Sequence, residues 1–161
     1  MIILGVDPGC RFSGFAILKK EKQKSYLLDY GCLTMSSKQP LVQRIGIFHE
    51  LFTEKIIKWK VTSIALETSF LGKNAQNFLK LGYLRGILYL LCNNYSLQLH
   101  EFSPREIKLS VTGYGAASKD QVARAVVQFF PAIKTKIPIR DDVTDALAIT
   151  LCGLWASKRF N

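Results

Sequence analysis

The sequence lacks any long apolar run. No window approaches the ~20 consecutive apolar residues of a membrane-spanning helix, so we expect no membrane span. The first residues enter an apolar stretch without a basic flank, which argues against a signal peptide and favours a cytoplasmic protein. Linkers, repeats and low-complexity segments are also missing. We therefore expect one domain spanning residues 1–161.

Closely spaced cysteines are missing too. The four cysteines are Cys10, Cys32, Cys92 and Cys152, and no two of them form a C-x-x-C pair. Zinc sites usually need closer spacing. We therefore expect no zinc site, and reduced, mostly buried thiols.

Acidic residues are scarce relative to basic ones. The chain has 22 Lys and Arg against 12 Asp and Glu, a formal charge of +10. This balance favours a polyanionic partner, with nucleic acid as the first candidate. An anionic membrane surface is second, although no basic amphipathic helix stands out. A generic solubilising surface is the remaining alternative.

The opening stretch combines a buried strand with a charge. Residues 2–6 are apolar and partly β-branched, which predicts a buried strand, and the run at 12–18 predicts its hairpin partner. Asp7-Pro8-Gly9 lies between them as a turn signal. A buried carboxylate is costly unless it is paired or bound to a metal. Asp7 is therefore either a cap for the turn or a chemical group.

The remaining pattern predicts an α/β fold. Further strands are expected at 25–35, 61–67 and 97–102, and helices at 41–59, 74–93, 104–112, 118–130 and 141–156. Ser103 with Glu106 and Ser118 with Gln121 form two capping boxes at helix starts. The order of elements predicts a mixed five-stranded sheet with helices on both faces.

Four of the few carboxylates lie at expected element ends. Glu67 ends the strand at 61–67 as Asp7 ends the first strand, so parallel pairing would bring both to the sheet edge where ligands bind. Asp142 and Asp145 are three residues apart and share a helix face. They could also be ordinary acids favoured by a helix N-terminus, and Asp141 looks like the helix cap.

Four converging carboxylates predict a metal site. Without a counter-ion they would raise one another's pKa, and oxygen-only ligands suit Mg²⁺ or Mn²⁺. Two such ions ~3.5–4 Å apart can stabilise the attacking and leaving oxygens of a phosphoryl displacement. Together with the charge of +10, this predicts metal-dependent cleavage of a phosphodiester backbone.

The chain resembles the RuvC family of bacterial Holliday junction resolvases, which have a ribonuclease H-like fold. The resemblance covers nearly the whole chain, and its motifs occur in the family's order: residues 3–9 with Arg11 and Gly14, 65–67, Phe70 with Lys73-Asn74, 79–82 with Arg85-Gly86, and 142–148. The opening hairpin alone is not specific, because actin-like ATPases and sugar kinases begin similarly.

The resemblance implies a crossover junction endodeoxyribonuclease active in homologous recombination and DNA repair. Family members are homodimers that cut four-way junction DNA by paired symmetric nicks, leave 5′-phosphate and 3′-hydroxyl ends, and work with the RuvA-RuvB branch-migration complex. Asp7, Glu67, Asp142 and Asp145 match the four metal-binding catalytic positions. One Mg²⁺, or Mn²⁺ in its place, would activate the water nucleophile, and a second would stabilise the 3′ leaving oxygen.

The resemblance also implies DNA contacts. Phe70 matches an aromatic residue that acts at the junction centre, and Lys108 and Lys119 match basic positions for DNA contact and cleavage. Phe70 beside Lys73 suits stacking on an unpaired base. Taken without the resemblance, Phe70 could equally pack in the core, and lysines usually just face water.

Gly82 and Gly86 form a G-x-x-x-G spacing that permits close helix packing. The helix that carries them could pack against the chain's own sheet, whereas the resemblance favours a dimer interface.

Two other functions remain open. An actin-like phosphotransferase would use the hairpin at Asp7-Pro8-Gly9 to cradle ATP phosphates, but it needs two such domains and no Asp142/Asp145 pair. A DNA-binding module that has lost catalysis would not need all four carboxylates. The complete acidic set therefore favours the nuclease.

Overall fold

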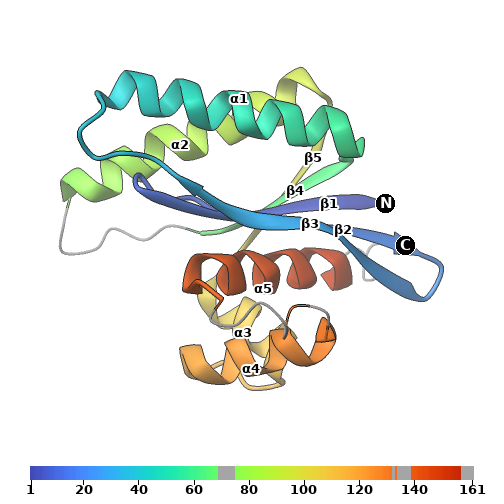
Figure 1. Cartoon of the computed structure of the whole chain (residues 1–161). Helices are drawn as coiled ribbons and strands as arrows, with labels where there is room; N and C mark the ends of the chain where they lie inside the picture. Colours follow the sequence, from blue (N-terminus) through green and yellow to red (C-terminus); the bar gives the residue numbers. More distant parts are fainter. Residues whose placement is uncertain (69–74, 132, 134–138, 157–161) are drawn as a thin grey trace.

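The structure, a computed structural model, describes residues 1–68, 75–131, 133 and 139–156 (Figure 1). Its strands are β1 (Ile2–Asp7), β2 (Phe12–Glu21), β3 (Lys24–Thr34), β4 (Ser63–Glu67) and β5 (Gln98–Phe102). Its helices are α1 (Leu41–Trp59), α2 (Ala75–Asn94), α3 (Pro104–Thr112), α4 (Lys119–Phe129) and α5 (Asp141–Ala156).

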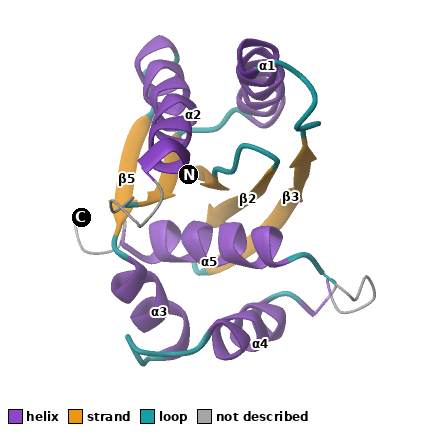
Figure 2. Ribbon diagram, turned by 90° about the vertical axis from the view of Figure 1, so that its left-hand side faces the viewer, coloured by secondary structure: helices purple, strands orange, loops and turns teal. Residues whose placement is uncertain are grey.

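The five strands form one mixed sheet in the order β3-β2-β1-β4-β5. The β1–β2 and β2–β3 pairs are antiparallel, and the β1–β4 and β4–β5 pairs are parallel. Helices α1 and α2 cover one face, whereas α5 lies on the other face with α3 and α4 beyond it (Figures 1 and 2). The predicted five-stranded sheet with helices on both faces is confirmed.

The alternation of side chains along β1 determines which residues point to each face of the sheet. Leu4 and Val6 are fully buried against the core on the α1 and α2 side, whereas Ile3 is buried in the core on the α5 side. Because side chains alternate with a period of two, Gly5 and Asp7 share the face of Ile3. Asp7 therefore points to the α5 side at the end of the central strand.

Two glycines let α5 approach that face closely. A Cβ on Gly5 would lie 2.0 Å from Thr150 Oγ1, and one on Gly14 would lie 1.8 Å from the carbonyl oxygen of Asp142. Any larger residue at either position would push the helix away. The N-terminal half of α5, which carries Asp142 and Asp145, is thereby held against β1 and β2.

The helix ends follow local signals in the sequence. Both predicted capping boxes are present, at Ser103 and Ser118, and Gly113 ends α3 with a φ of 76°. The prediction that Asp141 caps the last helix is wrong by one residue. The carbonyl of Arg140 accepts the bonds from Val143 N (3.0 Å) and Thr144 N (3.2 Å), so Arg140 holds the cap position and Asp141 opens α5.

The thiols and the helix lengths complete the description. Cys92 and Cys152 are buried, Cys10 and Cys32 are partly exposed, and none of the four is in a disulfide. Within the described ranges, every helix is too short or too polar to cross a membrane.

Candidate active site

The two inner parallel strands bring Asp7 and Glu67 together. β1 and β4 run in register with Val6 opposite Leu66, so the two acids that follow end neighbouring strands at the same edge. Leu66 is buried on the α1 and α2 side and Ala65 on the α5 side, so alternation turns Glu67 toward α5, as it does Asp7. The predicted parallel pairing of these strands is confirmed.

The N-terminal part of α5 adds the other acids. A pocket of about 390 Å³ is lined by Asp7, Glu67 and Asp145 together with Lys108 and Lys119. Asp142 does not line this pocket, but its charge acts on Asp7. The structure thus brings three of the predicted carboxylates and two of the predicted lysines to one pocket, with Asp142 near enough for its charge to act on Asp7. Phe70 and Lys73 lie outside the described residues.

Burial and mutual repulsion perturb these carboxyls. Burial, followed by the charges of Asp145, Glu67 and Asp142, raises the pKa of Asp7 to about 7. Burial and the charge of Asp145 also raise the pKa of Glu67. Burial raises the pKa of Asp145 although Lys119 opposes the shift. The site therefore holds more negative charge than its own side chains neutralise, which favours an added cation.

Asp7 does not act as the turn cap. Ser13 holds the turn instead, because its hydroxyl donates to the carbonyl of Gly9 (2.7 Å) and accepts from the N–H of Gly9 (3.1 Å). Among the described residues no donor hydrogen-bonds to the Asp7 carboxylate. Of the two alternatives drawn from the sequence, the structure supports the chemical one.

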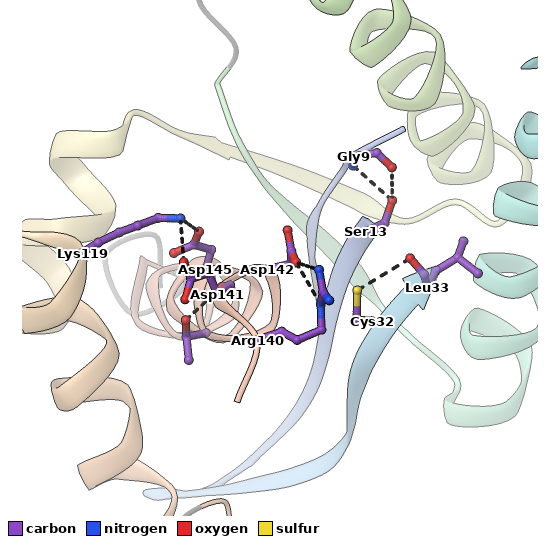
Figure 3. Close-up of polar contacts among 10 residues, drawn as sticks. Gly9, Ser13, Cys32, Leu33, Lys119, Arg140, Asp141, Asp142 and Asp145 are labelled. Atoms are coloured by element: carbon purple, nitrogen blue, oxygen red, sulfur yellow. Dashed lines mark hydrogen bonds and ion pairs between the residues drawn. The ribbon is translucent and has the colours of Figure 1, made fainter. Parts of the chain in front are cut away.

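Two cations reach the acids from opposite sides (Figure 3). Lys119 Nζ lies 2.9 Å from Asp145 Oδ2 and 3.9 Å from Asp141 Oδ2. On the other side, Arg140 donates to Asp142 Oδ2 from Nη2 (2.9 Å) and Nε (3.2 Å). Asp142 and Asp145 are thus each paired, whereas no ion pair to Asp7 is found among the described residues.

The donor set fits a divalent cation of the Mg²⁺ class. All four side chains offer only oxygen, the donor such ions prefer, and burial together with the charges of the three other acids raises the pKa of Asp7. In the arrangement described, no three His, Cys, Asp or Glu side chains of the described residues converge closely enough to coordinate one ion. The pairings of Asp142 with Arg140 and of Asp145 with Lys119 account for this, since each draws a carboxylate toward a cation.

The sequence alone assigns no role at the site to Arg85. Arg85 of α2 is buried, and its guanidinium donates to the backbone carbonyl of Glu67, to Tyr89 Oη (3.1 Å) and to the carboxylate of Glu101. It fixes the end of β4 from the helix side. The sequence signals were its place in the Arg85-Gly86 motif of the family resemblance and its charge within an otherwise apolar stretch of helix.

A second pocket lies away from the acids. It has a volume of about 480 Å³ and lies between β5, α3 and the end of α5, where Phe102, Leu109 and Trp155 line it. Its single acid, Glu106, caps α3. Although this pocket is larger, it lacks the convergence of charges, so we place the chemistry at the carboxylates.

Comparison with known proteins identifies the family. Residues 3–153 match the family model described as crossover junction endodeoxyribonuclease RuvC. The RuvC of Chloroherpeton thalassium is 42% identical over 157 residues, covering 98% of this chain and 83% of its own. The RuvC of Finegoldia magna is 36% identical over 158 residues, covering 98% and 95%.

A solved structure supports the fold. Thermus thermophilus RuvC in complex with a Holliday junction substrate superimposes with a TM-score of 0.89 at 24% identity, covering 99% of this chain and 96% of that one. The fold is therefore the ribonuclease H-like fold of RuvC. With a family model that spans nearly all of the sequence and relatives about 40% identical, this chain belongs to the RuvC family of crossover junction endodeoxyribonucleases.

Proposed function

We propose that this protein is a metal-dependent endonuclease that resolves four-way (Holliday) DNA junctions by paired, symmetric hydrolysis of phosphodiester bonds. The observation that carries the proposal is the meeting of Asp7 and Glu67, at the ends of parallel strands, with the first turn of α5 in a chain of this family. The products would carry 5′-phosphate and 3′-hydroxyl ends, and the reaction would serve homologous recombination and DNA repair in the cytoplasm.

Asp7, Glu67, Asp142 and Asp145 would hold the metal, Mg²⁺ or Mn²⁺, with two ions in each site. Bound there, the cations would lower the pKa of the attacking water and neutralise charge on the 3′ leaving oxygen. Asp7 is suited to a central position because Ile3, Leu4 and Val6 of its strand are fully buried and hold it rigidly.

Lysines of the same pocket would bind the DNA backbone. Lys108 and Lys119 line the pocket beside Asp7 and Glu67. An ammonium group there would offset the charge of a phosphate that approaches the acids, and contacts of this kind position DNA without reading its sequence. We also keep Phe70 and Lys73, the sequence's candidates for the junction centre, as proposed DNA-binding residues.

The partner surface we propose is α2. Its core side carries Leu84, Leu88 and Leu91, whereas Leu79, Tyr83 and Leu90 are exposed on another side. A Cβ on Gly82 or Gly86 would touch nothing within 4 Å, so packing within the chain does not require either glycine. An exposed apolar face with small residues suits an isologous homodimer, in which each protomer cuts one of two symmetry-related strands. Family membership carries the further proposal of the RuvA-RuvB complex as partner.

A cleavage assay tests the proposed function. The purified protein is incubated with Mg²⁺ and a mobile four-way junction, a linear duplex of the same sequence, or ATP. We expect paired nicks in the junction alone, sealed by DNA ligase without end treatment, and no ATP hydrolysis. ATP turnover without nicking would favour the actin-like alternative.

Substitution of one acid separates catalysis from binding. Glu67→Gln should lower cleavage about a thousandfold or more, because metal ions contribute several kcal/mol to such reactions, while junction binding in a gel-shift assay survives. Glu54, an exposed glutamate of α1, provides the matched control. Glu54→Gln should cut within about twofold of the unaltered protein. Equal cleavage by both variants would contradict the metal-site assignment.

A further inference from the structure

Arg140 is held by more contacts than an exposed arginine normally has. Its Nη2 and Nε both donate to Asp142 Oδ2, at 2.9 and 3.2 Å. Its Cζ lies 3.9 Å from the centre of the Phe12 ring, a cation–π distance, and the guanidinium lies beside the Cys32 thiol. A carboxylate, an aromatic face and a thiol, drawn from α5 and two strands, thus surround one cation.

Backbone contacts fix the position from which the Arg140 side chain extends. The Arg140 carbonyl accepts the first hydrogen bonds of α5, from Val143 N and Thr144 N. The absence of a side chain at Gly14 lets the Asp142 backbone approach β2. The side chain of Arg140 nevertheless keeps 47% of its surface exposed, and that of Asp142 keeps 28%. The Arg140 carbonyl is thus hydrogen-bonded to α5, while the exposed guanidinium has room to change rotamer.

We infer that Arg140 is a tethered counter-ion of the active site, which pairs with Asp142 in the metal-free protein and yields that carboxylate when a divalent cation binds. The inference rests on the proposed function, because it takes Asp142 as a metal ligand. A guanidinium keeps its charge at every physiological pH. It would therefore repel a divalent cation at the same carboxylate, and one of the two must move.

Once released from Asp142, the Arg140 guanidinium could bind a phosphate of the DNA. Its planar fork matches a phosphate as well as a carboxylate, and four-way junction DNA supplies phosphates at the site. Arg140 would then add one backbone contact on the side of the acids opposite Lys119, the side on which Figure 3 shows it. Neither the opening hairpin motif nor the acidic motif of α5 includes this residue.

The first test measures metal binding without DNA. Mn²⁺ is titrated into the metal-free protein, and free Mn²⁺ is followed by its electron paramagnetic resonance signal. Arg140→Gln should bind Mn²⁺ about twofold to fivefold more tightly than the unaltered protein, the range of an exposed ion pair. Arg140→Lys retains a positive charge and should stay closer to the unaltered protein.

Arg11 provides a matched control. Its guanidinium lies 5.0 Å from the same Phe12 ring, and no ion pair to a carboxylate is found for it among the described residues. Arg11→Gln removes the same charge and should change Mn²⁺ affinity by less than half of the Arg140→Gln factor. An equal gain in both variants would overturn the inference in favour of a general charge effect.

The remaining outcomes separate the inference from the proposed function. If the unaltered protein binds Mn²⁺ and Arg140→Gln binds it equally well, the counter-ion role is overturned while the metal site stands. If the unaltered protein binds no Mn²⁺ at millimolar concentration, the proposed metal site fails and the inference fails with it. Circular dichroism of Arg140→Gln, an exposed substitution, should match that of the unaltered protein.

The second test asks whether Arg140 contacts a DNA phosphate. Junction affinity is followed against salt with Ca²⁺ in place of Mg²⁺ to slow cleavage. Each phosphate contact adds about 0.9 to the slope of log affinity against log salt, so Arg140→Gln should lower that slope by about 0.9 per protomer. Arg140→Lys should retain the slope. An unchanged slope in Arg140→Gln would overturn the phosphate contact.

Discussion

Two aspartates of the same sheet lie in opposite electrostatic settings. Asp29 of β3 accepts hydrogen bonds from Lys55 Nζ (2.8 Å) and Trp59 Nε1 (3.0 Å), both from α1. Burial alone would raise the pKa of Asp29, but these two donors lower it below its ordinary value. Asp7 of β1 has three carboxylates as neighbours, and its pKa is raised to about 7.

The contrast separates a carboxylate that is paired within its own chain from one that we propose serves the chemistry. Asp29 is compensated by its own chain, so its charge contributes to stability. Burial and three acids raise the pKa of Asp7 and Lys119 opposes them only in part, so ionisation of Asp7 opposes folding. Groups with strongly perturbed pKa values often lie at functional sites, and the adjacent acids support the metal cation that we propose as the partner of Asp7.

The largest expected effect is that the same Asp-to-Asn substitution has opposite effects on the free energy of unfolding at the two sites. In EDTA at pH 8, Asp7→Asn should raise the free energy of unfolding by about 2–4 kcal/mol, because a pKa of about 7 against an ordinary 3.8 makes the ionised form costly. Asp29→Asn should lower it by about 1–2 kcal/mol through its two hydrogen bonds. Urea unfolding measures both.

The pH dependence gives the sign of each effect. Between about pH 4 and 7 the folded chain holds the Asp7 proton more tightly than the unfolded chain, so this contribution to stability falls as pH rises. The gain from Asp7→Asn should therefore shrink at pH 5. The loss from Asp29→Asn is present above the ordinary carboxyl pKa and disappears in acid. A gain from Asp7→Asn that is constant with pH would refute the burial argument.

The next largest effect is the change in stability when Mg²⁺ is added. At pH 8, 10 mM Mg²⁺ should stabilise the unaltered protein by about 1–2 kcal/mol through binding to the folded state alone. The gain should be smaller at pH 5.5, where protons compete for Asp7. Thermal unfolding with and without Mg²⁺ measures it. Asp29→Asn should keep the Mg²⁺ response and Asp7→Asn should lose most of it; the reverse pattern would place the metal elsewhere.

Much of this arrangement follows from local sequence signals. The predicted helices at 41–59 and 141–156 coincide with α1 and α5, because apolar periodicity and helix ends are encoded in neighbouring residues. The meeting of Asp7 with Glu67 followed from a single assumption, that two apolar strands separated by a helix run parallel. Chain connectivity makes that assumption strong.

The counter-ions could not be predicted in the same way. The sequence alone does not single out Arg140, and the pairing of Arg140 with Asp142 depends on how closely α5 approaches β2 at Gly14. Arg85 reaches the end of β4 from another element, across a buried interface. Such contacts depend on three-dimensional packing between elements, and a single sequence contains no local pattern for them.

The smallest expected effect resolves which donor compensates Asp29. A double-mutant cycle of Asp29→Asn with Lys55→Met should give a coupling of about 0.5–1 kcal/mol, since the pair is only partly exposed, at 22% and 14%. Met keeps apolar contact where Lys55 Nζ lies 5.0 Å from the Phe15 ring centre, so the cycle isolates the charge. The coupling should fall in 1 M salt. A coupling near zero at low salt would leave Trp59 as the effective partner, and Asp29 would then be held by a neutral hydrogen bond. In that case the different pKa shifts of Asp7 and Asp29 would come from burial and from the acids around Asp7. The ion pair of Asp29 with Lys55 would not contribute to the difference.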